Sequence, residues 1–384
     1  MPDSDEKQEL DGVARSIAAL FSDQDDEPAE DPRTEGDASE DLPWHGVASE
    51  SEVDAEPDKK VDADPDALAS ALDAFLATPQ LERGGRSTEI RELVTALREA
   101  NALDPLANAV ERLVLEAGDD EASLALARLM VTAGVASRLA VRLGSERDEE
   151  RRAQLVQVCN AIGLEMAVAI SDTLSETTDR FVRRTLMDAM IAMGATGMSV
   201  IEQMIEDGRW FVVRNGLAIL GEVGGERAVE LVTSSLANTD GRVRKEALLA
   251  LAKIGGEDAG MLVYGMLEDP DPEARLAAAT AAGALKVERA LKPLLRLLED
   301  EDDVDVTIGV LRALGQLGDP GAVNLIEKSA VASFFSRPPS DVRIVAYRAL
   351  FSIGTPHASK LVEQAVEDKD PEVQRFVREM LGER

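Results

Sequence analysis

A phrase of helical length recurs six times between residues 182 and 354, and five of the six copies end on glycine. Successive copies begin 30, 31, 31, 32 and 36 residues apart. A fixed period of roughly 20–50 residues is typical of solenoids, whose repeats pack only on their neighbours. The chain is therefore predicted to be all-α, an α-solenoid of stacked antiparallel helix pairs in which these copies are the second helices: Val182–Gly194, Val212–Gly224, Val243–Gly255, Ala274–Lys286, Val306–Gly318 and Val342–Gly354.

The composition and the turns favour helices. Apolar residues make up 45% of the chain and aromatic residues only 3%, and aromatic enrichment would indicate strands. Pro272 falls where the first turn of a helix tolerates a missing N–H. Lys286 ends one copy and predicts a looser stop there. The glycines that end the other copies predict left-handed (αL) stops: Gly194, Gly224, Gly255, Gly318 and Gly354.

Three regions differ in pattern. Residues 1–63 are acidic and poor in apolar residues, which predicts a disordered acidic tail. Residues 64–164 are helical in pattern but irregular in period, as expected of degenerate repeats that cap a solenoid. Residues 165–384 carry the regular repeats of about 31 residues. Asp64-Pro65 predicts the start of the first helix, with an acidic N-cap and proline at the first helical position.

The turn Asp269-Pro270-Asp271-Pro272-Glu273-Ala274-Arg275 and the junction Gly318-Asp319-Pro320-Gly321-Ala322 resemble those of HEAT repeats, specifically the bacterial HEAT-like repeats of the phycobilisome-lyase type. The resemblance is good over residues 165–384 and weak over 64–164. It implies a HEAT-like superhelix. It says little about activity, because such repeats serve many unrelated roles.

The resemblance also implies that an arginine near the start of each second helix is tied to an aspartate in the interhelix turn. At i, i+4 spacing the two side chains would share one helix face. Thr307 and Gln374 occupy the arginine position in two repeats and interrupt this row. An arginine row that recognises acidic ligands is the alternative interpretation of the same pairs: Asp148 with Arg152, Asp179 with Arg183, Asp240 with Arg244, and Asp271 with Arg275.

The sequence carries no constellation that indicates catalysis. His45 and His357 lack the neighbours in sequence that a triad or a zinc site needs. The single cysteine, Cys159, lies on an apolar helix face and is expected to be buried. The acidic run 299–303 predicts a solvated turn rather than a calcium loop, and 221–225 predicts a helix stop rather than a phosphate loop. We therefore expect no enzyme activity, no cofactor and no metal.

Charge narrows the classes of partner. The formal net charge is −33; residues 1–64 hold 22 acidic and 5 basic side chains, so they carry −17 of it. An acidic chain repels phosphate backbones, which disfavours nucleic acid as a partner. The N-terminus lacks the pattern of a signal peptide, and no run of apolar residues is long enough to span a membrane. A cytoplasmic protein is expected.

The segment Gly208–Asn215 is the most distinctive part of the repeats. It contains the only tryptophan of the repeats, Trp210, between Arg209 and Arg214. Tryptophan and arginine are enriched at the hot spots of protein interfaces, so these residues, together with Arg183 and Arg244, form the predicted partner-binding set. The alternative is that Trp210 fills the seam between two repeats, since tryptophan is mostly buried.

The tail holds a second candidate. An apolar stripe at helical spacing predicts a short amphipathic helix at 8–21, and Trp44 marks a separate apolar point. These residues predict a segment that recruits a partner or docks in the groove of its own solenoid: Leu10, Val13, Ile17, Phe21 and Trp44.

The most direct functional expectation is a non-catalytic scaffold or adaptor that binds an unidentified protein partner on the concave face of the solenoid. Two alternatives stay open. Resemblance to the phycobilisome-lyase repeats allows a lyase- or chaperone-like protein that acts on a tetrapyrrole-binding or other client protein. A DNA-binding HEAT-like protein is the other alternative, which the charge disfavours.

Overall fold

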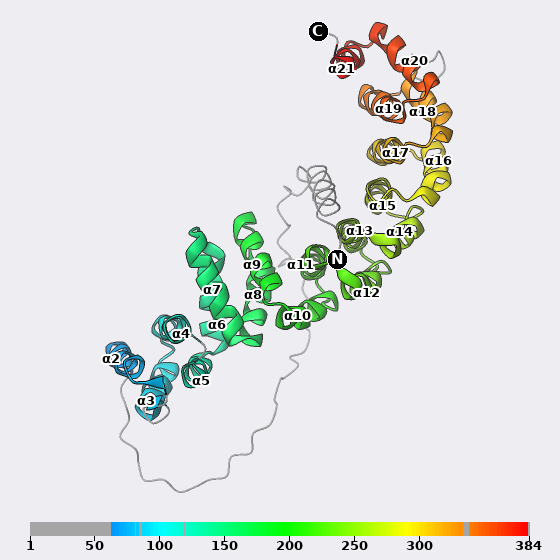
Figure 1. Ribbon diagram of the computed structural model, residues 1–384. Helices are drawn as coiled ribbons and strands as arrows, with labels where there is room; N and C mark the ends of the chain where they lie inside the picture. The colour runs from blue at the N-terminus through cyan, green and yellow to red at the C-terminus, as the bar shows by residue number, and fades with distance from the viewer. Residues whose placement is uncertain (1–62, 81, 84–86, 119, 333–337, 383–384) are drawn as a thin grey trace, which may run out of the picture. The chain divides into compact units, whose positions relative to one another are not determined.

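The computed structural model describes residues 63–80, 82–83, 87–118, 120–332 and 338–382, and these residues form helices, turns and loops without a strand (Figure 1). The predicted tail helix at 8–21, Trp44 and residues 333–337 lie outside the described residues. Contacts divide the described chain between Val131 and Thr132. We call 63–131 the N-terminal unit and 132–382 the C-terminal unit.

The N-terminal unit contains four helices, and its first helix begins as the sequence predicts. Pro65 is the first residue of that helix, and the Asp64 carboxylate accepts hydrogen bonds from the N–H groups of Asp66 and Ala67 at 2.9 and 3.1 Å. A buried ion pair, Arg83 Nη1 to Asp120 Oδ2 at 3.1 Å, links two loops of this unit. Its helices are α2 (Pro65–Leu76), α3 (Ser87–Glu99), α4 (Leu103–Ala117) and α5 (Glu121–Met130).

The C-terminal unit continues with helices of similar length joined by short turns. Half of them begin at an aspartate or threonine N-cap whose side chain accepts from the first-turn N–H groups, as at Asp240 and Asp271. The helices are α6 (Ala133–Ser145), α7 (Glu149–Ile162), α8 (Leu164–Glu176), α9 (Arg180–Ala192), α10 (Ala195–Ile205), α11 (Trp210–Val223), α12 (Gly225–Ser235), α13 (Gly241–Ile254), α14 (Gly256–Gly265), α15 (Pro272–Ala284), α16 (Leu291–Asp300), α17 (Val304–Leu317), α18 (Val323–Ala330), α19 (Ser340–Ile353), α20 (Pro356–Gln364) and α21 (Pro371–Leu381).

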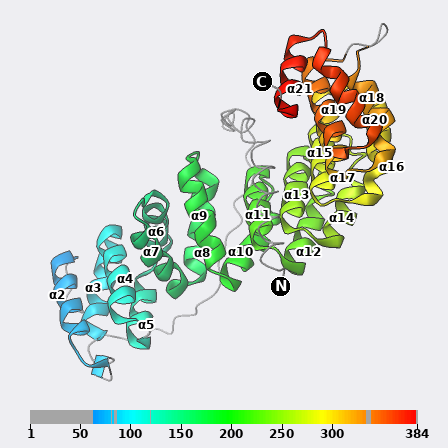
Figure 2. The same cartoon turned by 45° about the horizontal axis from the view of Figure 1, so that its top comes forward.

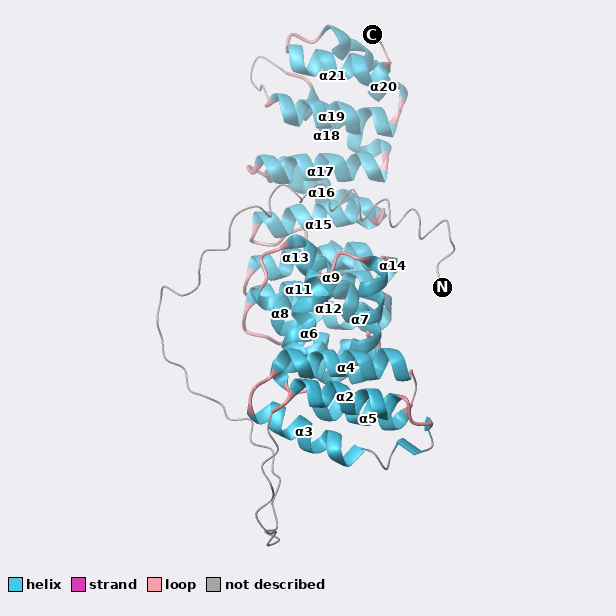
Figure 3. Cartoon of the chain, turned by 90° about the vertical axis from the view of Figure 1, so that its left-hand side faces the viewer, coloured by secondary structure: helices cyan, strands magenta, loops and turns pink. Residues whose placement is uncertain are grey.

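From α10 onward the helices form two rows. The second helices α11, α13, α15, α17 and α19 form one row and the first helices α12, α14, α16 and α18 form the other (Figures 1 and 2). Seen from the side, α13, α15, α17 and α19 lie one beside the next (Figure 3). The second helices pack extensively on one another and the first helices touch much less. The row of second helices is therefore the inner row of this unit.

Glycine and alanine let the inner helices approach closely. A Cβ added at Gly221 would lie 3.1 Å from the Cα of Ala250, and one at Gly283 would lie 2.6 Å from the Cα of Ala313. Gly315 of α17 makes the same approach to α19. Gly221 is thus a packing residue inside α11 rather than part of the predicted helix stop, which begins at Gly224.

The predicted helix stops all have positive φ, but only some are αL. Gly318 and Gly354 have ψ values of 14° and 19° and are left-handed, as predicted. Gly224 and Gly255 have ψ of −170°, a region that only glycine occupies readily, and Gly194 has ψ of −124°. The αL prediction is therefore wrong at these three, where the chain enters the next helix at once instead of first forming a longer turn.

Lys286 does not loosen its stop. It adopts φ of +50°, and the hydrogen bonds Val287 N–H to Ala282 O (2.9 Å) and Lys286 N–H to Gly283 O (3.1 Å) complete a Schellman motif. Val287 is buried beneath it. The helix therefore ends as firmly here as at the glycines, with a lysine in a backbone conformation that favours glycine.

Candidate functional site

Trp210 and four neighbours form an aromatic–guanidinium cluster at the inner-row turns. Trp210 is the first residue of α11 and is partly exposed. The Arg242 guanidinium of α13 lies 4.0 Å from its ring centroid, and that of Arg214 lies 5.7 Å away. Phe211 packs edge-on at 6.2 Å, with Arg209 5.7 Å from the Phe211 ring. Arg242 belongs to the next repeat and lies over the Trp210 ring. Trp210 is therefore both at the seam between two repeats and part of the arginine-rich surface.

Two carboxylates hold this cluster in place. Asp207 pairs with Arg209 at 2.9 Å and Asp240 pairs with Arg242 at 2.7 Å. The guanidinium hydrogen bonds lower the pKa of both carboxyl groups below the ordinary aspartate value. Both arginine side chains remain more than half exposed. Arg242 was not predicted from the sequence, although it is the second residue of the next inner helix, two residues after its N-cap Asp240.

Arg244 lies elsewhere, in a buried ion pair between two repeats. Its Nε and Nη2 donate to the two Asp269 oxygens at 2.8 and 2.7 Å, and its Nη1 donates to the carbonyls of Asn238 and Thr239. The two side chains are only 11% and 4% exposed. The predicted i, i+4 pair with Asp240 is wrong here, because the Asp240 carboxylate caps its own helix by accepting from the Arg242 N–H.

The same arrangement recurs and forms what we call the arginine ladder: Arg244 with Asp269, Arg275 with Glu301, and Arg343 with Asp368. In each case the partner lies 25 or 26 residues further along, in the turn of the next repeat. The predicted pair of Arg275 with Asp271 is therefore wrong too, because Arg275 pairs with Glu301. Glu301 is 6% exposed, so the acidic run 299–303 is not a fully solvated turn.

Each acid of the arginine ladder also fixes its own turn. Asp269 accepts from the Asp271 N–H, and Glu301 accepts from the Asp303 N–H. Burial opposes the ionisation of Asp269 and Glu301, but the guanidinium and the backbone N–H outweigh it, so the pKa of these two carboxyls lies below the ordinary value. The charged pair is thus the form that the folded state stabilises.

The arginine ladder is interrupted where both partners change together. Val213 takes the arginine position in α11, and Asn238 takes the acid position that such an arginine would reach. Asn238 still accepts from the Asp240 N–H at 2.9 Å, so it fixes the turn without needing a cation. At this repeat both partners are replaced together, so no buried charge stays unpaired. We infer that the ladder pairs stabilise the fold rather than bind a ligand.

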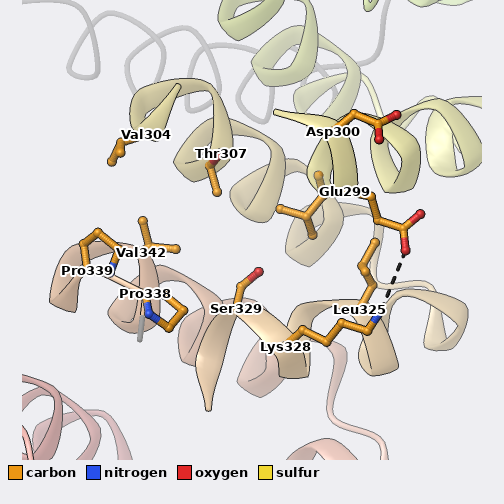
Figure 4. A pocket seen from close by; sticks show the side chains of 11 residues that line it. Glu299, Asp300, Val304, Thr307, Leu325, Lys328, Ser329, Pro338, Pro339 and Val342 are labelled. Atoms are coloured by element: carbon orange, nitrogen blue, oxygen red, sulfur yellow. Dashed lines mark ion pairs between the residues drawn. The ribbon is translucent and has the colours of Figure 1, made fainter. Parts of the chain in front are cut away.

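Thr307 interrupts the arginine ladder a second time and leaves a hollow. Its hydroxyl donates to the Asp303 carbonyl instead of reaching the next turn. The hollow beside it measures about 650 Å³ and lies between α16, α17, α18 and the start of α19 (Figure 4). At its edge Lys328 and Glu299 lie 3.7 Å apart. Its wall continues toward Pro338 and Pro339, beside the undescribed residues 333–337.

A strip without acidic side chains runs along the inner row. Positions five, nine and thirteen residues after the N-caps of α13, α15, α17 and α19 lie on one side of each helix and are at least partly exposed, except for the buried Thr280. Acids on these helices lie in the first turn, as at Glu273 and Asp305, apart from Glu246 beside the strip on α13. We call these positions the inner strip: Lys245, Leu249, Lys253, Leu276, Thr280, Ala284, Ile308, Arg312, Gln316, Ile344, Arg348 and Ser352.

Arg312 and Arg348 occupy equivalent positions on the adjacent helices α17 and α19. Neither forms an ion pair within the described residues, and Arg348 instead lies over Phe376 at 5.0 Å. Burial and the charge of Arg348 lower the pKa of Arg312 below the ordinary arginine value. A partly buried guanidinium beside a second one, without a carboxylate, is an arrangement that an anionic ligand would stabilise. Neither residue was predicted from the sequence.

The remaining predicted residues do not join these clusters. Arg183 donates to the Thr177 carbonyl at 3.3 Å, in the turn before α9. Cys159 is buried as predicted, and burial raises its pKa to about 12. His357 lies at the α20 junction, 2.8 Å from Glu327. Within the described ranges no group of His, Cys, Asp and Glu is arranged to hold a metal ion.

No single described helix is long and apolar enough to cross a bilayer. The consecutive helices α5 and α6 meet that criterion only when they are taken together, by length and composition alone.

Part of the chain matches a known repeat family. The family model of HEAT repeats matches residues 260–334, from α14 to beyond α18. No curated protein matches the chain significantly by sequence. The narrower phycobilisome-lyase type stays a prediction.

Three solved structures are similar at low identity. An engineered protein is 17% identical, with 83% of this chain and 98% of that chain covered at a TM-score of 0.37. Kap121p bound to Nup53p is 11% identical, with 82% and 39% covered at 0.47, so this chain spans well under half of Kap121p. Human deoxyhypusine hydroxylase in complex with glycerol is 18% identical, with 56% and 95% covered at 0.26. These likenesses concern the fold alone; residues 260–334 are HEAT repeats, within a chain whose described residues form an all-α solenoid.

Proposed function

We propose that this protein is a non-catalytic scaffold that binds a protein partner on the inner row of its C-terminal unit. HEAT-repeat solenoids typically present extended binding surfaces rather than catalytic sites. The acidic tail would serve as a recruiting or self-docking segment in the same protein.

The observation that carries this proposal is the aromatic–guanidinium cluster. Trp210 is an aromatic side chain that stays partly exposed, and the two most exposed cations around it, Arg209 and Arg242, are fixed in position by carboxylates. A rigid aromatic anchor ringed by positioned arginines has the composition of an interface hot spot. Arg244 and Arg183 of the predicted set contribute to the turns instead, so the binding set becomes Arg209, Trp210, Arg214 and Arg242.

Affinity capture with matched variants tests the proposal. Wild-type chain, Trp210→Ala and Tyr264→Ala would be compared, because Tyr264 is a 41% exposed aromatic on the outer helix α14. We expect particular partners to be lost with Trp210→Ala and retained with Tyr264→Ala, with both variants as helical as the wild type. Equal recovery with all three proteins would exclude the cluster as the binding site.

A further inference from the structure

We propose that the inner strip of α13–α19 is the docking site for residues 3–27 of the same chain, with 8–21 as a helix. This inference rests on the proposed scaffold function and names the first occupant of its inner surface. It is carried by the order of charges along the strip.

The inner strip reads cationic, neutral and cationic across successive helices. Lys245 and Lys253 lie on α13, three uncharged side chains lie on α15, and Arg312 and Arg348 lie on α17 and α19. Neighbouring packed helices are about 8–10 Å apart. The two cationic groups on α13 and α17 are therefore separated by roughly 20 Å, with α15 and its apolar Leu276 between them.

Residues 3–27 carry the complementary order. Five acids lie at or before position 11 and four more lie from 23 to 27, with most of the apolar stripe of 8–21 between them; the segment also contains Lys7 and Arg15. A 14-residue helix is about 21 Å long, which matches the separation of the two cationic groups. The acids that would face the strip are Asp3, Asp5, Glu6 and Glu9 at one end and Asp23, Asp25, Asp26 and Glu27 at the other.

The cations of the strip are available to such a ligand. Arg312 and Arg348 have no carboxylate partner in the described part of the chain. Lys245 pairs with Glu273 and Lys253 with Glu222, and both carboxylates are more than a third exposed. The lysine side chains are 17% and 24% exposed, but because their carboxylate partners face solvent, pairs at the surface contribute on the order of 0–1 kcal/mol and the lysines can exchange partners.

Covalent connection favours the chain's own segment over a free ligand. Residues 22–62 provide 41 residues between the predicted helix and the described chain, and a flexible chain of that length spans roughly 35 Å on average. Tethering raises the effective concentration of a segment only when the linker can span the two sites, and 41 residues reach up to about 135 Å when fully extended. A nucleic-acid strand, by contrast, would meet a chain of net charge −33 and apolar side chains between the cations.

Photo-crosslinking in the full-length protein tests this docking. A photo-reactive amino acid at position 14, on the apolar stripe, would be activated at low protein concentration and its attachment sites mapped by mass spectrometry. We expect intramolecular crosslinks to α13, α15, α17 and α19. Crosslinks mainly to outer helices, or mainly between two molecules, would overturn the proposal.

Charge reversal supplies the matched comparison. Arg312→Glu with Arg348→Glu should lower the inner-strip crosslink yield about tenfold, whereas Lys292→Glu with Arg296→Glu on the outer helix α16 changes net charge equally and should leave it unchanged. Leu10→Asp with Phe21→Asp should lower the yield without altering any repeat, which keeps the test valid if the first variant misfolds. Equal yields in all variants would refute the docking. The capture experiment with Trp210→Ala tests the proposed scaffold function independently of this outcome.

Discussion

At the scale of single residues, Lys286 shows how the repeat tolerates a departure from its own pattern. Its φ of +50° completes the Schellman motif that ends α15. The left-handed conformation is roughly 1–2 kcal/mol less favourable for a residue with a Cβ, and the burial of Val287 beneath the turn offsets this strain. The conformation is imposed by the neighbouring repeat, because the chain must turn at this point to place α16.

Substitution at this position should follow backbone preference. Lys286→Gly should stabilise the C-terminal unit by about 0.5 kcal/mol, because the released strain exceeds the added chain entropy of glycine. Lys286→Val should destabilise it by about 1–2 kcal/mol, because a β-branched residue disfavours positive φ. Denaturant midpoints followed by circular dichroism would give the order.

Lys286→Ala separates the backbone from the side chain. It keeps the Cβ and removes the lysine's own contacts, so its difference from wild type measures those contacts alone. A valine variant as stable as the alanine variant would contradict the left-handed assignment.

At the scale of helices, the inner row depends on glycines that intrinsic propensity disfavours. Glycine in a helix interior is about 1 kcal/mol less favourable than alanine. Gly283 is retained against that preference at a point where an added Cβ would lie 2.6 Å from the Ala313 backbone. The close approach of α15 to α17 thus outweighs local propensity.

Gly283→Ala should therefore destabilise the protein, by roughly 1–3 kcal/mol for an overpacked contact. Gly265→Ala in α14 is the matched control, since a Cβ there meets nothing within 4 Å, and we expect it to be neutral or slightly stabilising. Thermal midpoints of both variants would be compared. A stabilising Gly283→Ala would mean that α15 and α17 can separate without loss.

Helix existence could be predicted from sequence far better than side-chain pairing. Spacing and capping residues located most helices, because both signals are local. The arginine ladder was assigned to the wrong acid, because Asp240 is four residues from Arg244 whereas its true partner, Asp269, is 25 residues away. The joint change of Val213 and Asn238 was visible in the sequence and could have indicated that pairing.

The candidate surfaces show the same limit. Arg209, Trp210 and Arg214 are local in sequence and were found together. Arg242 and the pair of Arg312 with Arg348 depend on which faces of successive helices adjoin, and a single repeat does not contain that information.

At the scale of the whole molecule, lowering the pH changes the stability of the folded state in two opposing ways. Lowering the pH toward the sequence pI of about 4.4 reduces the repulsion within a chain of net charge −33. The arginine ladder responds in the opposite direction. The folded-state pKa of Asp269 lies below its unfolded value, so its contribution is present above the unfolded pKa of about 4 and is lost as pH falls through the folded pKa.

Asp269→Asn isolates the second effect. The variant should be less stable than wild type by about 2 kcal/mol at neutral pH, because Arg244 loses its buried charged partner. The difference should shrink as pH falls below about 4, where the wild-type carboxylate becomes protonated too. Urea midpoints of both proteins at pH values above and below the pI measure this directly, and a difference that stays constant across the range would show that the ion pair does not stabilise the fold. Asp305→Asn, at an exposed first-turn acid of α17, is the control, and the same midpoints should show little change for it at any pH.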